Sequence, residues 1–296
     1  MNYYLGIDGG GTKTTAAVCN ENGEIICRAT GKTLNFYSVG MEICRENLQS
    51  LIAEIENSCG VNSFKAVVIG CSALDSKADA PTVEALCGGI INSPNIYMDS
   101  DAYVALKAAR DGCVAICGTG SMAIGEKRNG EIVVTGGWGH IIGDEGSAYA
   151  ISINALKKCC EFVDSNVSSP LLERATAFFQ VDDFRKAIDY IYSLNTTKAD
   201  IAKFSAEVDA LAKENCPEAV KIISEEAQKY SKTVASLLSQ LDDCKILYLY
   251  GGVFENSSLF REEFSENIFK YFPNITIKLL TISAEEGALR VAMGLK

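Results

Sequence analysis

Two glycine-rich segments of the chain have residue types and spacing suited to holding a phosphate group. The first, GIDGGGTK, covers residues 6–13, and the second, GTGS, covers residues 118–121. Each lies between two apolar runs typical of β-strands. Glycine lets the backbone come close to phosphate oxygens, and successive backbone N–H groups can then bind them. The sequence therefore predicts two phosphate-binding turns, with plain hairpin turns as the alternative.

The first turn differs from the phosphate loop of P-loop nucleoside triphosphatases. That motif requires Gly-Lys-Ser/Thr followed by a helix. Here Thr12 separates Gly11 from Lys13, and residues 14–19 are β-branched and apolar, as in a strand. We therefore expect a hairpin turn between two strands. Asp8, at the end of the preceding strand, is suited to contacting Mg²⁺ through water.

Two aspartates offer a carboxylate for acid–base chemistry. Asp99 and Asp101 follow a predicted strand, residues 96–98, and precede a predicted helix, residues 102–110. Phosphoryl transfer to a hydroxyl needs a carboxylate that orients the hydroxyl and takes its proton. Alternation along a strand places both aspartates on one face, so spacing leaves both as candidates. Asp99, Ser100 or Asp101 could equally cap the helix.

These candidates lie in a pattern of elements that occurs twice. Both copies begin with strands around a glycine-rich turn, and each then has an Asn-Gly hairpin signal, at residues 22–23 and 129–130. Residues 2–31 are therefore predicted to form three strands, and the same pattern of strands begins again at residue 114. The first copy continues with predicted helices 41–58, 82–86 and 102–110 and predicted strands 65–70 and 96–98.

The second copy contains a long helical insertion, residues 147–241. The duplicated order βββαβαβα predicts an α/β protein of two lobes with a central cleft. We expect an N-terminal lobe over residues 1–110 and a C-terminal lobe over residues 111–296, with helix 284–296 able to pack back on the N-terminal lobe. After the insertion come predicted strands 246–250 and 276–280 and predicted helices 258–271 and 284–294.

The overall composition limits the partners that the chain can bind. It has 296 residues, a formal net charge of −11 and a pI near 4.8. A protein without a basic excess does not replace the counterions of nucleic acids or anionic membranes, so we expect neither partner. The sequence shows no signal-peptide pattern and no apolar run long enough to span a bilayer. We therefore expect a cytoplasmic location.

Twelve cysteines are scattered along the chain. None has the C-x-x-C spacing common in zinc and cluster sites; the nearest patterns are Cys113 with Cys117 and the adjacent Cys159 and Cys160. Small buried thiols in a reducing compartment are therefore the favoured interpretation.

The segment GGWGHIIGDEGSAY, residues 136–149, is the most specific motif of the chain. Together with the two turns, it makes the chain resemble the actin/hexokinase/Hsp70 superfamily, and within it the family of N-acetylglucosamine kinases and BadF-type ATPases. The resemblance covers essentially the whole chain. It implies two duplicated ribonuclease H-like lobes, ATP and Mg²⁺ as cofactors, an amino sugar as substrate, and a homodimer.

The resemblance also implies roles for individual residues. It selects Asp101 over Asp99 as general base. YLYGGVFEN, residues 248–256, resembles the adenosine-side motif. The implied nucleotide contacts are Gly10, Gly11, Thr12, Lys13, Gly118, Thr119, Gly120, Ala212, Gly251 and Gly252. The implied sugar contacts are Asn35, Asp101, Ser121, Gly137, Trp138, Gly139 and Asp144, with Glu145 ranked below Asp144.

The sequence allows other acceptor sugars and other classes of activity. N-acetylglucosamine is the favoured acceptor, and N-acetylmuramate or glucosamine are the others. The loop 71–75 departs from the glycine-rich turn common in the family, so the sequence does not decide which sugar is the acceptor. A protein of another class would be an ATPase activator of a dehydratase or reductase, which holds an iron–sulfur cluster with cysteines after the second turn. Residues 136–149 contain no cysteine. A nucleotide-binding scaffold without turnover is the third option.

Overall fold

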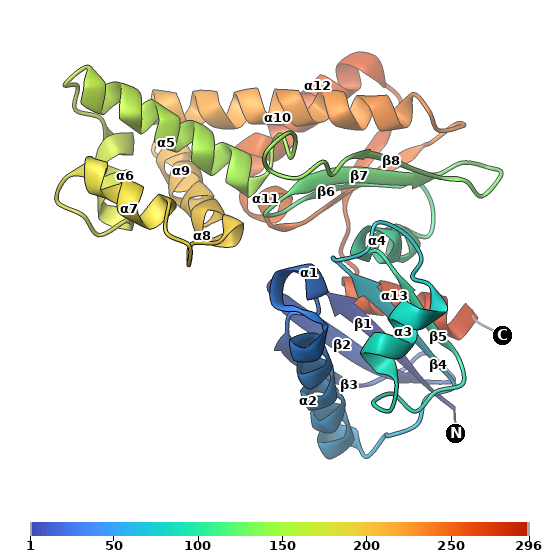
Figure 1. Ribbon diagram of the computed structural model, residues 1–296. Helices are drawn as coiled ribbons and strands as arrows, with labels where there is room; N and C mark the ends of the chain where they lie inside the picture. The colour runs from blue at the N-terminus through green and yellow to red at the C-terminus, as the bar shows by residue number, and fades with distance from the viewer. Residues whose placement is uncertain (1, 295–296) are drawn as a thin grey trace. The chain divides into compact units, whose positions relative to one another are not determined.

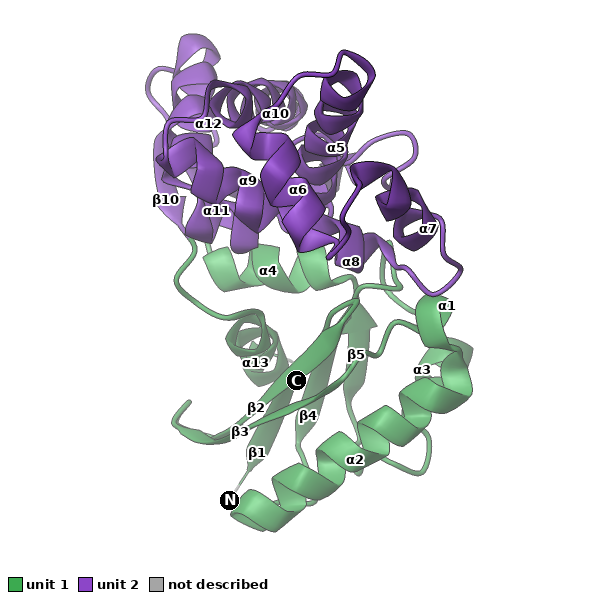
Figure 2. Cartoon of the chain, turned by 90° about the vertical axis from the view of Figure 1, so that its left-hand side faces the viewer, with its two compact units in different colours: residues 1–111, 280–296 green, residues 112–279 purple. Residues whose placement is uncertain are grey.

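The computed structural model describes residues 2–294 and divides them into two compact units, coloured separately in Figure 2. Unit 1 combines residues 2–111 with residues 280–294, and unit 2 is residues 112–279. The sequence analysis placed the division after residue 110 and left helix 284–296 with either lobe. The described part of that helix lies in unit 1, and its last two residues lie outside the described residues.

Each unit contains a five-stranded mixed sheet, and the two sheets have the same topology (Figure 1). The order is β3-β2-β1-β4-β5 in unit 1 and β8-β7-β6-β9-β10 in unit 2. This repetition confirms the duplicated α/β lobes. The strands are β1 (Tyr3–Gly9), β2 (Lys13–Asn20), β3 (Ile25–Lys32), β4 (Ala66–Cys71), β5 (Ile96–Asp99), β6 (Cys113–Cys117), β7 (Ser121–Glu126), β8 (Ile132–Gly136), β9 (Ile246–Tyr250) and β10 (Thr276–Leu279).

The helices fall where the hydrophobic periodicity predicts them, apart from two short ones. The unpredicted helices α1 (Phe36–Val39) and α11 (Gly252–Asn256) are too short to show a period. No helix within residues 2–294 is both long and apolar enough to cross a membrane. The others are α2 (Met41–Cys59), α3 (Ala80–Cys87), α4 (Asp101–Ala109), α5 (Ala148–Asp164), α6 (Pro170–Phe178), the 3₁₀ turn η1 (Phe184–Lys186), α7 (Ala187–Ile191), α8 (Lys198–Ala202), α9 (Phe204–Lys213), α10 (Pro217–Leu238), α12 (Ser258–Tyr271) and α13 (Ala284–Gly294).

The alternation of side chains along β1 sorts the helices of unit 1 onto the two faces of its sheet. Leu5 and Ile7 are buried in a core that includes Leu48 of α2. Gly6, between them, faces the other way, where a Cβ atom would lie 2.3 Å from the backbone oxygen of Glu285 in α13. Figure 2 shows α2 and α13 on opposite sides of this sheet. Glycine at position 6 therefore lets α13 pack directly against β1.

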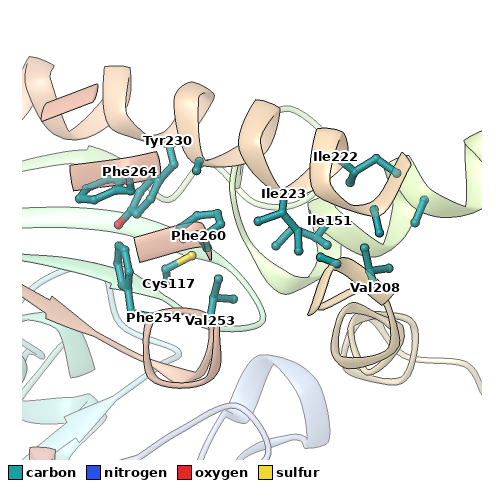
Figure 3. Packing of buried hydrophobic residues seen from close by; sticks show 14 of the residues in the cluster. Cys117, Ile151, Val208, Ile222, Ile223, Tyr230, Val253, Phe254, Phe260 and Phe264 are labelled. Atoms are coloured by element: carbon teal, nitrogen blue, oxygen red, sulfur yellow. The ribbon is translucent and has the colours of Figure 1, made fainter. Parts of the chain in front are cut away.

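Aromatic side chains fill the space between the sheet and the helices of unit 2 (Figure 3). The buried ring of Tyr230, on α10, lies 5.5 Å from that of Phe264 and 6.0 Å from that of Phe254. Its hydroxyl lies 2.9 Å from the backbone oxygen of Ile116 and 2.7 Å from that of Met122. Burying one large apolar side chain stabilises the fold by roughly 1.5–3 kcal/mol. The polar end of Tyr230 is satisfied by two neighbouring strands, so its burial carries little penalty.

Candidate active site

The first glycine-rich turn, residues 10–12, joins β1 to β2 as a hairpin. The two strands are antiparallel, with Gly9 opposite Thr14. The side chain of Thr33 donates a hydrogen bond to the backbone oxygen of Gly10 at 2.8 Å. Gly11, Thr12 and Lys13 are exposed. A strand follows the turn instead of a helix, which confirms that this is not a P-loop, and the exposed positions leave the backbone of the turn accessible to a ligand.

The second turn, residues 118–120, joins β6 to β7 in the same way. Cys117 lies opposite Ser121 in the antiparallel register. The N–H of Gly118 donates to the backbone oxygen of Gly120 at 2.9 Å. Both predicted hairpin turns are therefore present, at equivalent places in the two units.

A cavity of about 550 Å³ in unit 2 brings the second turn together with the Gly251–Gly252 segment. Gly118 and Thr119 line it, and Gly252 lines it from the start of α11. A volume in the range of about 300–1,000 Å³ is typical of small-molecule sites. The other lining residues come from five helices and the start of α12: Ala148, Ile151, Ala199, Ala202, Lys203, Ser205, Ala206, Asp209, Lys213, Ile223, Val253, Asn256 and Ser257.

The helix α9 presents charged residues, and not the expected alanine, to this cavity. Ala212 is buried in the hydrophobic core of unit 2 and is not among the residues that line the cavity. Asp209 and Lys213, on the same helix, do line it, and their side chains form an ion pair of 2.6 Å. Lys213 also donates to the backbone oxygen of Asn256 at 3.3 Å. The residues of α9 that line the cavity are Ser205, Ala206, Asp209 and Lys213.

An ion pair lies directly beside the second turn. The Nζ atom of Lys198 is 2.5 Å from Oδ2 of Asp144. A Cβ atom on Gly120 would lie 2.9 Å from each of these two atoms, so a larger residue there would displace the pair. Asp144 is only 4% exposed and has a φ of +62°. The sequence analysis named Asp144 and missed Lys198, which no motif marks.

Ser121 positions the segment 136–149. Its hydroxyl donates to the backbone oxygen of Glu145 at 2.7 Å, and the N–H of Gly137 donates to the backbone oxygen of Ser121 at 3.0 Å. Ser121 itself is buried. The structure therefore gives its hydroxyl a protein partner at one end of this segment, while its predicted sugar contact stays a prediction.

Glu226 holds the same segment at Gly146, the residue next to Glu145, and no motif of the sequence marks it. This buried residue of α10 accepts hydrogen bonds from the N–H of Gly146 and from Nδ2 of Asn154, each at 2.8 Å. Its carboxylate also lies 2.6 Å from Nζ of Lys229. A glutamate four positions before Tyr230, on the apolar face of a long amphipathic helix, is the signal that could have identified it.

Trp138 is 74% exposed, between two glycines that both have positive φ angles, Gly137 at +73° and Gly139 at +81°. His140 is also exposed, and its ring packs edge-on against that of Tyr149 with 4.9 Å between the ring centroids. An exposed indole offers a flat apolar face and an N–H donor, which suits a sugar ring. This arrangement agrees with the predicted role of Trp138 without testing it.

The three candidate caps at the end of β5 have different partners. Ser100 is the N-cap of α4, and its hydroxyl accepts the N–H of Tyr103 at 3.1 Å. Asp99 is buried and accepts hydrogen bonds from Tyr97 and from the N–H of Ser100, both at 2.7 Å. Asp101 is the first residue of α4 and accepts the N–H of Ala102 at 2.8 Å. Burial raises the pKa of Asp101, and the hydrogen bond from Ala102 opposes this shift.

Asp8 has a strongly perturbed carboxyl group. Burial, and after it the negative charges of Asp101 and Glu285, raise its pKa to about 7 against the opposing effect of Lys13. The carboxyl groups of Asp8 and Asp101 are therefore close enough to repel each other when both are charged. Within residues 2–294, no three acidic, histidine or cysteine side chains gather into a metal site. A cation bound here would therefore need water or a ligand to complete its coordination.

Asn35 is linked to the first turn through Ser72. Its Oδ1 accepts the N–H of Ser38 at 3.1 Å and caps α1, while its Nδ2 donates to Oγ of Ser72 at 3.2 Å. The N–H of Ser72 donates to the backbone oxygen of Gly9 at 2.9 Å. Ser72 belongs to the loop 71–75 that departs from the family pattern. The sequence analysis noted that loop but not this residue.

Two units of one topology, each with a glycine-rich turn between its first two strands, define the class of the actin-like ATPases. The model of the BadF/BadG/BcrA/BcrD ATPase family matches residues 5–292. The chain belongs to this family.

Individual proteins are similar to the chain over nearly its whole length. The N-acetylmuramic acid/N-acetylglucosamine kinase of Clostridium acetobutylicum is 29% identical over 301 residues, covering 99% of this chain and 98% of that protein. The N-acetyl-D-glucosamine kinase of Dictyostelium discoideum is 27% identical over 320 residues, with the same two coverages. A solved structure from Chromobacterium violaceum, described as a candidate N-acetylglucosamine kinase, has a TM-score of 0.80 and 20% identity, covering 99% of both chains.

Proposed function

We propose that the protein is an ATP-dependent kinase that transfers the terminal phosphoryl group of ATP to a hydroxyl of N-acetylglucosamine. The observation that carries the proposal is the cavity of unit 2, around which the second glycine-rich turn and Gly252 meet. The names of the full-length relatives support an amino sugar as acceptor, with N-acetylmuramate as a second acceptor. Glucosamine is the alternative acceptor.

Asp101 is the proposed general base. It orients the acceptor hydroxyl and takes its proton as the new oxygen–phosphorus bond forms and the bond from phosphorus to the departing ADP oxygen breaks. Burial raises the pKa of its carboxyl group, which makes the carboxylate a better proton acceptor than a solvated aspartate. Backbone N–H groups of the two turns stabilise negative charge on the phosphate oxygens.

Three further side chains are proposed to hold the sugar. Trp138 packs against one face of the ring, because its indole is exposed on a short glycine-flanked segment. Asp144 accepts hydrogen bonds from ring hydroxyls, and Asn35 contributes an amide. The backbone of Gly137 and Gly139 flanks the ring. Water is kept from the phosphoryl group when the bound sugar occupies the acceptor position.

Asp8 is the residue proposed to hold Mg²⁺. The charges of Asp101 and Glu285 that raise its pKa fit a divalent cation, because such a cation would relieve their repulsion. Asp8 would contact the ion through water, and oxygens of the nucleotide phosphates would supply further ligands. When bound, Mg²⁺ neutralises charge on the phosphate oxygens of the nucleotide.

The experiment is a kinase assay of the purified chain with N-acetylglucosamine, N-acetylmuramate, glucosamine, N-acetylmannosamine and glucose. We expect ADP release that depends on N-acetylglucosamine, and a phosphorylated sugar as product. ADP release with glucosamine but not with N-acetylglucosamine would show that glucosamine is the acceptor. ADP release that no sugar stimulates would overturn the proposal and favour either a scaffold or an ATPase activator.

Two physical measurements separate the remaining classes. An activator that carries an iron–sulfur cluster absorbs visible light, whereas a sugar kinase is colourless. We also expect a homodimer, which light scattering of the purified protein measures directly. A coloured protein with oxygen-sensitive absorbance would argue for the activator.

A further inference from the structure

We propose that Lys198 binds the terminal phosphoryl group of the nucleotide and carries the specificity of the site for a triphosphate over a diphosphate. The inference rests on the proposed function, because it requires a nucleotide in the cavity of unit 2. It goes beyond that function because Lys198 lies outside every motif of the sequence. Its helix, α8, belongs to the insertion that separates the third and fourth strands of the second unit.

The position of Lys198 relative to the second turn carries the argument. A Cβ atom placed on Gly120 would lie 2.9 Å from Nζ of Lys198. The ammonium group therefore lies beside Gly120, and the two residues before it in the turn, Gly118 and Thr119, line the cavity. A phosphate bound by the N–H groups of this turn comes within reach of a lysine at this position.

The order of residues along the turn indicates which phosphate of the nucleotide lies near Lys198. Gly118 and Thr119 line the cavity, whereas Gly120, Lys198 and Asp144 do not. A nucleotide whose body fills the cavity reaches the turn at Gly118 first. Asp144 is proposed to hold the acceptor sugar. The group that lies between the nucleotide and the sugar is the one that is transferred, so Lys198 meets the terminal phosphoryl group.

The ion pair with Asp144 orients Lys198 and leaves it able to bind. A lysine ammonium has three donors, and the bond to Oδ2 of Asp144 uses one. The side chain of Asp144 is 5% exposed and that of Lys198 is 28% exposed, so the lysine is the more accessible member of the pair. Lys203, which follows on the same insertion, pairs with Asp200 at 2.7 Å and its side chain is 68% exposed. Lys198 is thus the lysine fixed against the turn.

The test is calorimetric binding of ADP and of the non-hydrolysable β,γ-imido analogue of ATP to the full chain, with Mg²⁺ and without sugar. We expect Lys198→Met to weaken the binding of the analogue by about 10- to 100-fold, which corresponds to the loss of one charge-assisted hydrogen bond. ADP affinity should change by less than about threefold, and Lys198→Arg should retain most of the affinity for the analogue. Lys158→Met is the matched control, because it removes one lysine and one ion pair, with Glu161, from an exposed part of α5.

A second variant separates phosphate binding from a purely structural role. Lys198→Met leaves the buried carboxylate of Asp144 without its partner, and this alone could distort the turn. Lys198→Met/Asp144→Asn removes both charges. If Lys198 only neutralises Asp144, the double variant regains wild-type affinity for the analogue and the proposal is wrong. If Lys198 binds phosphate, the double variant binds the analogue as weakly as the single one.

The outcomes also distinguish this proposal from the proposed function. Equal weakening of ADP and the analogue by Lys198→Met overturns the role of Lys198 while leaving a nucleotide site in place. A wild-type chain that binds neither ligand overturns both proposals. Should the single variant fail to fold, as thermal denaturation would show, the double variant decides between the two roles by itself.

Discussion

The hydroxyl of Tyr97 donates a hydrogen bond to Oδ2 of Asp99 over 2.7 Å. Oδ1 of Asp99 accepts the N–H of Ser100 at the same distance, so both of its oxygens have partners in a buried place. Asp101 accepts only backbone N–H groups from the start of its own helix, among them that of Ala102 at Oδ1, and no side chain of the described residues donates to it. Strand alternation cannot separate the two aspartates. Their partners do, and they support Asp101 as the carboxylate available to a substrate.

The first prediction concerns this pair of aspartates. Asp101→Asn removes the proposed proton acceptor while keeping the shape of the side chain, so kcat should fall by about 10²- to 10⁴-fold. The KM for ATP should change little, because the nucleotide is held elsewhere. Initial-rate kinetics with N-acetylglucosamine measure both quantities.

Asp99→Asn is the matched control for that experiment. An asparagine at position 99 can still accept the N–H of Ser100 at Oδ1 and can donate from Nδ2 to the hydroxyl oxygen of Tyr97, so kcat should stay within about tenfold of the wild type. Full activity of Asp101→Asn, or a larger loss in Asp99→Asn than in Asp101→Asn, would contradict the assignment of the base.

The second prediction is a pH dependence of stability set by Asp8. Its folded-state pKa is raised from 3.8 to about 7, so the folded chain holds this proton more tightly than the unfolded chain. Stability should therefore fall as pH rises from about 4 to about 7, and the full cost is present above pH 7. Asp8→Asn removes the cost, and it should stabilise the chain at pH 8 by roughly 1–2 kcal/mol, allowing for solvent screening.

Thermal denaturation at pH 5 and pH 8, without divalent cations, tests this expectation. The gain in Tm of Asp8→Asn over the wild type should be larger at pH 8 than at pH 5. Asp242→Asn removes one charge of the same sign from an exposed turn of unit 2 and should show no such difference. A gain that is equal at both pH values would mean that Asp8 ionises normally.

The third prediction concerns Glu226, which anchors the segment 136–149. Glu226→Ala leaves the N–H of Gly146 and the amide of Asn154 without their acceptor, so we expect a loss of about 2–4 kcal/mol in the free energy of unfolding. The KM for the sugar should rise on the order of tenfold, because the proposed contacts Trp138 and Asp144 lie on this segment.

The neighbouring glutamate provides the control. Glu225 is exposed, and its carboxylate lies 3.8 Å from Nζ of Lys221. Glu225→Ala should leave both the free energy of unfolding and the sugar KM close to the wild-type values. Glu226→Gln retains an acceptor and should recover part of the loss. Equal effects of the two alanine substitutions would show that Glu226 does not anchor the segment.

The sequence predicted those parts of the fold that depend on neighbouring residues. The Asn-Gly turns, the hairpins around both glycine-rich turns and the long amphipathic helix α10 follow from local signals. The duplicated sheet order follows from the repetition of those signals. Trp138, Asp144 and the glycines around them came from a motif, and the structure places them on one short segment between β8 and α5.

The contacts that hold the site together were outside the reach of local patterns. Lys198 is 54 positions from Asp144 along the chain, and Glu226 is 80 positions from Gly146. Each pair meets only because the helical insertion folds back onto the second unit. Periodicity assigns a residue to a face of a helix, but it does not identify the partner beyond that face. On α9 the family resemblance implies Ala212, whereas the residues of that helix that line the cavity are Ser205, Ala206, Asp209 and Lys213.

The fourth prediction tests how the end of the chain completes unit 1. A Cβ atom on Gly287 of α13 would lie 2.6 Å from Cβ of Ala108 and 2.7 Å from the backbone oxygen of Val104, both on α4. Backbone atoms cannot move aside as a flexible side chain can, so Gly287→Ala should force the two helices apart. We expect a loss of about 1–3 kcal/mol in the free energy of unfolding.

Gly294→Ala, at the other end of the described part of α13, is the matched control. A Cβ atom there meets nothing within 4 Å. Because alanine favours a helix over glycine by up to about 1 kcal/mol, this variant should be neutral or slightly more stable. Urea denaturation of both variants measures the difference. A loss in Gly287→Ala no larger than the change in Gly294→Ala would mean that α13 does not depend on this close approach to α4, and that unit 1 tolerates its displacement.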